Sequence, residues 1–382
     1  MIGDALLLLL EGAATLGCVF LVAAAGLVRA FARARPPTAN AARPVTILKP
    51  LHGAETGLFE NLASFCRQDY RGPIQIVFGV ADPNDAAIGV IARLRAAFPG
   101  LDLDLVVDPR RAGSNPKIAN LINMSGRIRH DTIVVADSDI RVAPDYLARV
   151  MAALEPEGTA ATCLYFGMPV GGTWARLAQL QIDSHFLPSV VVGVRLGLAH
   201  PCLGSTMALR AGDLAAIGGF AAFADCLADD YEIGAALRRR GIAVRLAPTA
   251  VGHTCTEASW RELWNHELRW ALTIRSIVPV GYVGWVVSHP FPLALLALAL
   301  GGGMPALALA FAAVGCRAAV LRAVERGLAA PAHAYWLIPL RDLLSFVVFV
   351  AGLTARNVVW RGHRYRLMSK GILGSERRSP SP

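Results

Sequence analysis

The chain has 382 residues, of which 54% are hydrophobic and 17% are charged, and its mean hydropathy is +0.46. This composition is too apolar for a purely soluble enzyme and too interrupted for a bundle of membrane helices alone, so it favours a soluble domain joined to membrane segments. The net charge is +9, and the Lys and Arg residues concentrate beside the apolar stretches. That pattern indicates anionic lipid headgroups rather than nucleic acid as partners.

The first apolar run covers residues 5–28 and carries Glu11 as its one charge. About 20 apolar residues suffice to cross a bilayer as a helix, so this run predicts a transmembrane anchor. A cleaved signal peptide fits less well, because no Lys or Arg precedes the run and it exceeds the usual ~7 to 15 apolar residues. Several arginines follow directly, so the positive-inside rule places the soluble part of the chain in the cytoplasm.

Two further apolar runs lie toward the C-terminal end. Residues 277–316 are long enough for two crossings, and the glycines at 301–303 predict a hairpin between them. Residues 334–355 carry Arg341 and Asp342 at their centre, where an ion is costly unless it is paired or lies at an interface. Basic residues flank that run on both sides, and both flanks therefore favour the cytoplasm. We expect the run to be re-entrant or interfacial rather than a simple span.

Between these apolar regions, short β-rich runs alternate with helical ones, which predicts an α/β domain with a mostly parallel sheet. The run at 132–136 is continuously apolar, as is typical of a strand buried on both faces. The sequence contains no P-loop, and no GxGxxG motif follows the first strand. The expected segments are an anchor at 1–30, a linker at 31–43, a catalytic domain at 44–274, a C-terminal membrane region at 275–373 and a tail at 374–382.

Acidic residues follow two of the predicted strands. Asp82 comes after the strand that ends at Val80, and Asp137 and Asp139 belong to a DSD sequence directly after residues 132–136. In such sheets, ligands bind beyond the carboxyl ends of the strands. Two carboxylates two positions apart can hold a Mg²⁺ or Mn²⁺ ion, which neutralises charge developing on a leaving diphosphate. Taken alone the motif is weak evidence, because acids in such turns are commonly solvated or cap a helix.

Two later motifs carry further candidate side chains. Asp229 and Asp230 precede a helical run, and one of them can act as general base for an acceptor hydroxyl, although the helix macrodipole alone favours acids there. His266, Arg269 and Trp270 occur in the sequence HELRW and share roughly one face of a predicted helix. An aromatic and an arginine at that spacing are often a packing pair, and they can equally close a site over a diphosphate and an acceptor.

The order and spacing of Asp82, the DSD sequence, the DD pair and HELRW resemble the D, D, D, (Q/R)xxRW pattern of glycosyltransferases of families 2 and 21. The flanking sequences KPL, NPK and WRGHRYRL look like those of ceramide glucosyltransferases. Within that family, LADDY at 227–231 and HELRW look closest to bacterial hopanoid-biosynthesis-associated glycosyltransferases. The resemblance covers nearly the whole chain. It implies an α/β, nucleotide-sugar-binding GT-A-type Rossmann-like domain with an N-terminal transmembrane helix and C-terminal membrane-associated helices.

The resemblance also implies a role for each position that matches the family pattern. Asp82 would contact the uridine, and Asp137 and Asp139 would contact the metal and the diphosphate. Asp230 would be the catalytic base. One departure is a histidine where the last motif has Gln or Arg, which leaves open any role that needs a permanent charge or an amide there. The other implied positions are Lys117, Arg269 and Trp270 in the donor and acceptor pocket, and His185 and His266 on the acceptor side.

The resulting hypothesis is an inverting, metal-dependent transferase that moves a hexose or N-acetylhexosamine from a UDP-sugar to a membrane lipid hydroxyl. The acceptor would be a hopanoid such as bacteriohopanetetrol, or a ceramide. The enzyme would be a multi-pass inner-membrane protein with its catalytic domain in the cytoplasm and no nucleic-acid partner. A processive polysaccharide synthase shares the acidic motifs but needs more spanning helices to form a channel. A non-catalytic membrane-binding module would explain the anchors but not the acidic sites.

Overall fold

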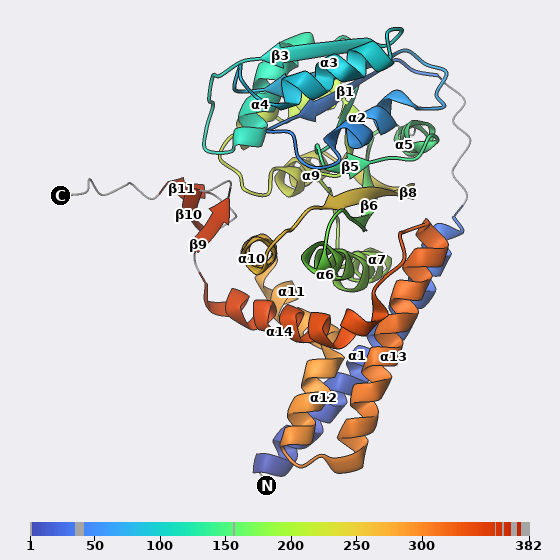
Figure 1. The fold of residues 1–382 in the computed structure, drawn as a ribbon, viewed down its shortest axis with the longest axis vertical. Helices are drawn as coiled ribbons and strands as arrows, with labels where there is room; N and C mark the ends of the chain where they lie inside the picture. Colours follow the sequence, from blue (N-terminus) through green and yellow to red (C-terminus); the bar gives the residue numbers. More distant parts are fainter. Residues whose placement is uncertain are drawn as a thin grey trace, which may run out of the picture. The chain divides into compact units, whose positions relative to one another are not determined.

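A computed structural model describes residues 2–34, 42–155, 157–355, 357–360, 363–367 and 373–375 (Figure 1). The chain divides into two compact units. The sheet unit comprises residues 34–165 and 200–256, and the helical unit comprises residues 1–33, 166–199 and 257–382. Residues 166–199 lie inside the expected catalytic segment 44–274 and nevertheless belong to the helical unit. Most of the expected linker and tail, and residues 361 and 362 of the WRGHRYRL sequence, lie outside the described residues.

The sheet unit is built on an eight-stranded sheet with the strand order β3-β2-β1-β4-β7-β6-β8-β5. The four strands β3, β2, β1 and β4 pair in parallel, which confirms the expected Rossmann-like half. The pairs β4–β7, β6–β7 and β5–β8 are antiparallel, so the sheet is mixed rather than mostly parallel. The strands are β1 (Val45–Pro50), β2 (Ile74–Val80), β3 (Asp102–Val107), β4 (Thr132–Val135), β5 (Ile140–Arg141), β6 (Thr159–Pro169), β7 (Met207–Arg210) and β8 (Ala243–Cys255).

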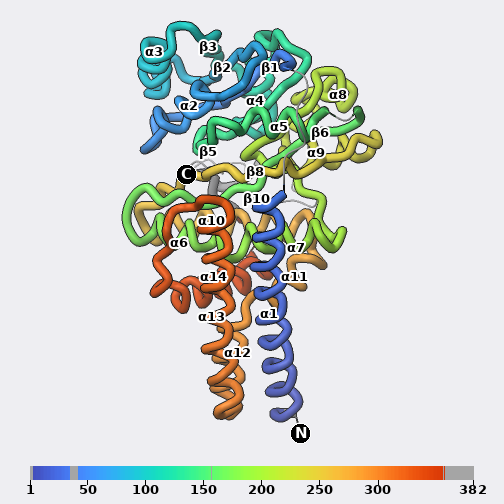
Figure 2. The backbone as a smooth tube through the Cα atoms, turned by 90° about the vertical axis from the view of Figure 1, so that its right-hand side faces the viewer, coloured from blue at the N-terminus to red at the C-terminus, as the bar shows by residue number. Residues whose placement is uncertain are grey.

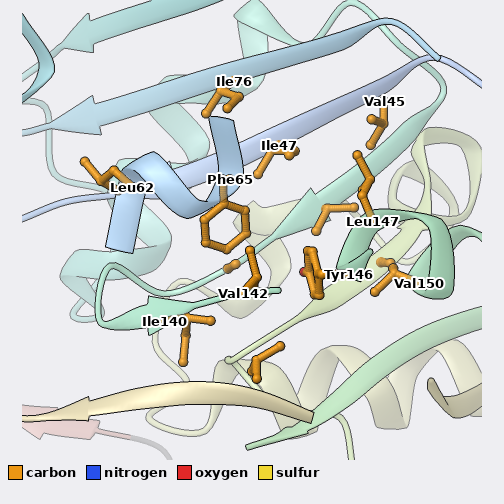
Figure 3. Close-up of a cluster of buried hydrophobic side chains, with 14 of the residues drawn as sticks. Val45, Ile47, Leu62, Phe65, Ile76, Ile140, Val142, Tyr146, Leu147 and Val150 are labelled. Atoms are coloured by element: carbon orange, nitrogen blue, oxygen red, sulfur yellow. The ribbon is translucent and has the colours of Figure 1, made fainter. Parts of the chain in front are cut away.

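Helices cover both faces of this sheet because its central strands bury side chains on both sides. On β1, Val45 and Ile47 pack into one buried cluster and Leu48 into the other. In the first cluster, the rings of Phe65 and Tyr146 meet edge to face with centroids 5.6 Å apart (Figure 3). The first cluster includes α2 (Leu58–Cys66), α3 (Ala87–Ala97) and α5 (Tyr146–Leu154), and the second includes α4 (Pro116–Met124), α8 (Ala211–Ala216) and α9 (Asp229–Arg239).

Three apolar helices of the helical unit run side by side, as Figure 2 shows for α1 (Ile2–Ala32), α12 (Pro290–Ala299) and α13 (Gly303–Leu328). Helices α1 and α13 are long and apolar enough to cross a membrane, as expected for the anchor. The turn between α12 and α13 falls at Gly301–Gly303, where the hairpin was predicted. The first helix of this hairpin is not straight, because α12 and the preceding helical residues Pro279–Ser288 meet at a bend of 67°.

Helix α14 (Ile338–Thr354), with the short turn before it, is a third candidate span by length and composition. Its two charged residues are buried and paired: Arg341 with Glu267 at 2.6 Å and Asp342 with Arg317 at 2.9 Å. Pairing of this kind removes most of the cost of placing ions in an apolar segment. Figure 1 shows α14 running across the direction of α12 and α13. That arrangement favours the expected interfacial placement, which stays a prediction.

The helical unit contains several further helices and strands. Residues Ile182–Phe186 form a π-helical turn between two of the helices. Strands at the C-terminal end form an antiparallel three-stranded sheet, whose last strand includes the first two residues of the expected tail. The helices are α6 (Thr173–Gln181), α7 (Leu187–Arg195), α10 (Trp260–Ile277) and α11 (Pro279–Gly284), and the strands are β9 (Asn357–Trp360), β10 (His363–Leu367) and β11 (Leu373–Ser375).

Candidate active site

The DSD turn leaves β4 and is held on both sides by other strands of the sheet unit. The buried side chain of Lys49, on β1, donates to the carbonyl oxygen of Asp137 at 2.5 Å. The backbone N–H of Thr254, on β8, donates to the carbonyl oxygen of Asp139 at 2.8 Å. Both partners come from strands of the sheet and bind main-chain oxygens, so they hold the backbone of the turn without using its two carboxylates. Burial lowers the pKa of Lys49 to about 7, although the two aspartates oppose this.

Lys117 brings two of the predicted acidic sites together. It lies in the first turn of α4, whose N-cap Asn115 accepts hydrogen bonds from the Lys117 and Ile118 backbone N–H groups. Its Nζ lies 2.7 Å from Asp137 Oδ1 and 3.3 Å from Asp229 Oδ2. Burial by itself lowers the pKa of Lys117, but the neighbouring carboxylates outweigh this and raise it above its ordinary value. The ammonium is therefore a permanent positive charge at the carboxyl end of β4.

Asp229 and Asp230 start α9 but face different partners. Asp229 is buried, lies near Lys117 and accepts a hydrogen bond from Asn115 Nδ2 at 3.2 Å. Asp230 is partly exposed and accepts from the backbone N–H groups of Gly204 and Tyr231, both at 2.8 Å. Burial and the charge of Asp229 raise the pKa of Asp230 to about 6, against the opposing effect of Lys117 and the two N–H groups. A carboxylate with this pKa is suited to accept a proton near neutral pH.

Asp139 is the residue that best fits a metal ligand. Its Oδ2 lies 3.6 Å from His253 Nδ1, and its buried Oδ1 has no hydrogen-bond partner within the described part of the chain. The described residues contain no group of three or more Asp, Glu, His or Cys side chains that could enclose a metal. A Mg²⁺ or Mn²⁺ ion held with a nucleotide needs one or two carboxylates, since phosphate oxygens and water complete its shell. Asp137 and Asp139 fit such an ion.

Asp82 lies beyond the carboxyl end of β2, in the expected position. Its side chain is exposed and accepts a hydrogen bond from the Asn84 backbone N–H at 2.8 Å. Asp85, in the same loop, accepts from the backbone N–H of Gly53 at 3.0 Å, so the loops after β1 and β2 are tied together. This leaves the Asp82 carboxylate accessible at the edge of the sheet where ligands bind in α/β folds.

The HELRW residues lie on α10 in the helical unit, as a helix was predicted. The N-cap Ser259 accepts a hydrogen bond from the Glu262 backbone N–H, and the Glu262 carboxylate accepts one from the backbone N–H of Ala258. His266 and Trp270 contact each other edge to face with ring centroids 4.5 Å apart. The sequence reasoning assigned no role to Glu267, which is buried and pairs with Arg341 of α14.

A small cavity of about 20 Å³ lies within the helical unit, large enough for one water molecule. Trp270 and Phe186 form part of its aromatic wall, and Ser345 and Glu267 are polar residues at its edge. Arg269 is half-buried on the same helix and does not line this cavity. Trp270 lines this cavity, and its assignment to the donor and acceptor pocket stays a prediction.

The two histidines expected on the acceptor side have close partners of their own. His185 is fully buried, and its Nε2 lies 3.1 Å from Asp342 Oδ1. Burial and Arg317 hold the pKa of His185 well below its ordinary value. His266 Nδ1 lies 2.6 Å from Glu257 Oε1. These contacts explain both residues structurally, and the acceptor assignments stay predictions.

Three further residues of the site were not identified from the sequence: Lys49, His253 and Gly204. Lys49 carried a signal, because a lysine that ends an apolar strand in the sequence KPL requires a partner if it is buried. His253 and Gly204 had no signal in the sequence, since their proximity to the acidic residues depends on the antiparallel strands of the sheet. These strands bring residues far apart in the sequence to one edge.

Comparison with known proteins gives a consistent assignment. The model of the family described as Glycosyl transferase family 21 matches residues 11–373. Ceramide glucosyltransferase 1 of Caenorhabditis elegans is 23% identical over 228 residues, covering 59% of this chain and 48% of that protein. Ceramide glucosyltransferase of Candida albicans is 31% identical over 121 residues, covering 29% of this chain and 22% of that protein. The matched region thus spans about half or less of the length of these relatives.

Solved structures show distant likenesses. A mannosyltransferase from Pyrobaculum calidifontis, in complex with GDP-Man and Mn²⁺, has 19% identity and a TM-score of 0.48 and covers 90% of this chain and 99% of its own. Glucosyl-3-phosphoglycerate synthase from Mycobacterium tuberculosis, with Mn²⁺ and UDP-Glc, has 17% identity and a TM-score of 0.36 and covers 66% and 82%.

Proposed function

The chain belongs to glycosyl transferase family 21, and from this premise we propose that it moves a hexose or N-acetylhexosamine from a UDP-sugar to a membrane lipid hydroxyl. The observation that carries the proposal is the ionic contact of Lys117 with both Asp137 and Asp229, next to Asp230. A fold that only bound membranes would have no need to gather four charged groups at the carboxyl edge of its sheet. The relatives named ceramide glucosyltransferase favour ceramide as acceptor, and a hopanoid is the alternative that the LADDY and HELRW sequences suggest.

On the donor side, three groups have separate tasks. Asp82 is exposed beyond β2, where it can accept hydrogen bonds from the uridine. Asp137 and Asp139 would hold a divalent metal, which when bound offsets the charge of the leaving diphosphate. Lys117 supplies a fixed positive charge beside the same phosphates.

On the acceptor side, Asp230 acts as the general base. Its carboxylate takes the proton of the lipid hydroxyl while the hydroxyl oxygen forms a bond to the anomeric carbon of the sugar. The bond between that carbon and the phosphate oxygen breaks on the opposite face, and UDP leaves with the electron pair. A single displacement of this kind inverts the anomeric configuration. Asp229 is held by Lys117 and Asn115, which leaves Asp230 as the accessible acid of the pair.

Four residues of the helical unit complete the proposal for the acceptor. Trp270 is proposed to offer an apolar ring to the lipid acceptor. Arg269 provides a cation on the same helix. His185 and His266 are proposed to support this region indirectly, through their buried contacts with Asp342 and Glu257.

The proposal includes an inner-membrane location with a cytoplasmic catalytic domain, and the charges at the helix ends support this orientation. The C-terminal ends of α1 and α13 lie together, since a Cβ added to Gly327 would be 2.9 Å from Ala32 Cβ. Arg29 and Arg326 occupy the last turns of these two helices. The other end of α1 carries Asp4 in its first turn. The positive-inside rule then places the arginine end in the cytoplasm.

The direct test is UDP release by the full-length protein in lipid vesicles. We expect release from UDP-hexoses when Mg²⁺ or Mn²⁺ and a hydroxylated lipid are both present, and loss of release when a chelator is added. Vesicles with ceramide and vesicles with bacteriohopanetetrol separate the two acceptors, and mass spectrometry identifies the glycosylated lipid. Binding to vesicles without UDP release from any UDP-hexose would favour a non-catalytic membrane protein and refute the proposal.

A further inference from the structure

One residue of the sheet unit, Gly204, contacts both carboxylate sites through its backbone. The backbone N–H of Gly204 donates to Asp230 Oδ2 at 2.8 Å, and the Gly204 carbonyl oxygen accepts from the backbone N–H of Asp137 at 3.2 Å. Gly204 thereby connects the first turn of α9 with the turn that follows β4. A hydrogen bond from a backbone N–H also sets the direction in which the Asp230 carboxylate points.

The segment around Gly204 is a rigid turn. The backbone N–H of Thr206 donates to the Leu203 carbonyl oxygen at 3.0 Å. The Thr162 hydroxyl, on β6, accepts from the Leu203 backbone N–H at 2.9 Å and donates to the Thr206 carbonyl oxygen at 2.8 Å. Gly204 itself is buried. Because the turn is anchored on β6, its position is set by the sheet and not by the ligand.

Because residue 204 is a glycine, it also leaves space for the charged side chains beside it. A Cβ added there would lie 2.7 Å from Asp137 Oδ2 and 3.0 Å from Lys117 Nζ, both closer than ordinary contacts. These atoms are the ends of side chains, so the fold can accommodate an alanine by displacing them. The displaced groups would be the Asp137 carboxylate, proposed to bind the metal, and the Lys117 ammonium that pairs with it. An alanine at this position should therefore impair metal binding and turnover more than folding stability.

We propose that Gly204 is a positioning residue, which fixes the base Asp230 relative to the metal-binding carboxylate of Asp137 and leaves room for that carboxylate. The inference rests on the proposed function of these two aspartates. It assigns Gly204 no contact with the substrate and no part in the chemistry. Its expected signature is a loss of metal affinity and of turnover without a matching loss of stability.

The test compares Gly204→Ala with Gly212→Ala in the full-length protein. Gly212 lies in α8 of the same unit, and a Cβ added there would meet nothing within 4 Å. We expect Gly204→Ala to weaken Mn²⁺ binding, measured by electron paramagnetic resonance without donor, by at least about tenfold. A misplacement of about 1 Å also lowers kcat by about 10²-fold. The melting temperature should stay within a few degrees of the unmodified protein, and Gly212→Ala should match it in every measurement.

A second pair of variants covers the case in which Gly204→Ala fails to fold. Thr162→Val removes the hydroxyl that anchors the turn, and Thr162→Ser retains it. We expect weaker Mn²⁺ binding and lower kcat for Thr162→Val and recovery of both for Thr162→Ser. Unchanged Mn²⁺ affinity and kcat in Gly204→Ala, or in Thr162→Val if the first variant is unfolded, would overturn the inference. If the unmodified protein neither binds Mn²⁺ nor releases UDP, the proposed function itself fails.

Discussion

Replacement of Asp230 by asparagine separates a catalytic role from a structural one. The asparagine keeps one carbonyl oxygen, so one of the two N–H donors, from Gly204 or Tyr231, loses its acceptor. The site is partly exposed and water can replace that bond, which limits the cost to about 1 kcal/mol of stability. The amide cannot accept the proton of the acceptor, and loss of a general base costs about 10² to 10⁴ in rate. That rate loss corresponds to about 3 to 5 kcal/mol of activation free energy.

Asp229→Asn is the matched control, because the structure predicts the opposite balance. Asp229 is buried and lies 3.3 Å from Lys117, which keeps only Asp137 when the charge is removed. We therefore expect a stability loss of about 1 to 3 kcal/mol and a smaller loss of kcat than for Asp230→Asn. The assay is kcat at saturating UDP-hexose and lipid, with thermal unfolding of both variants. Equal and mild losses of kcat in the two variants would refute the assignment of the base.

Four other predictions follow from the same site and from the buried ion pairs. Asp139→Ala should abolish turnover and weaken Mn²⁺ binding while the protein remains folded; near-normal activity would remove the metal role from this residue. Asp82→Ala should raise the KM for donor more than it lowers kcat, since a uridine contact is equal in ground and transition states; the reverse result would contradict that. Because the pKa of Asp230 is raised to about 6 and the base acts when deprotonated, kcat/KM should fall as the pH drops below about 6; a profile flat to pH 4 would exclude this base. Arg341→Met leaves the buried Glu267 unpaired and should cost about 3 to 5 kcal/mol of stability, most of which Glu267→Met in the same chain should restore; a mild single effect would show that the pair is solvated.

The sequence allowed the parallel half of the sheet and the positions of its acidic loops to be predicted. Strands β1, β2 and β4 are short runs rich in β-branched and apolar residues, and acidic residues follow β2 and β4, so the edge where Asp82 and Asp137 lie was expected from the pattern. The family resemblance added the expectation that Asp230 belongs to the same active site as these two loops. Local periodicity was sufficient because each of these elements is defined by its own few residues.

The antiparallel half and the buried ion pairs could not be predicted in this way. Gly204 and Asp137 are brought together by pairing of β4 with β7, and no local signal specifies which distant strands pair. Arg341 and Glu267 are separated by 74 positions, so the sequence indicated that the charge on α14 needs a partner but not which one. The same limit applies to Lys49, whose partner is a backbone carbonyl without any side-chain signature.

The chain passes between the two units several times, and this has a consequence for its synthesis on the ribosome. The chain leaves the helical unit after residue 33, returns for residues 166–199, leaves again, and enters it a final time at residue 257. No single cut can therefore release the sheet unit as one continuous fragment, because residues 166–199 interrupt it. Helix α1 also emerges from the ribosome long before α13, the helix against which it packs. The face of α1 that packs on α13 therefore stays without this partner until α13 has been made.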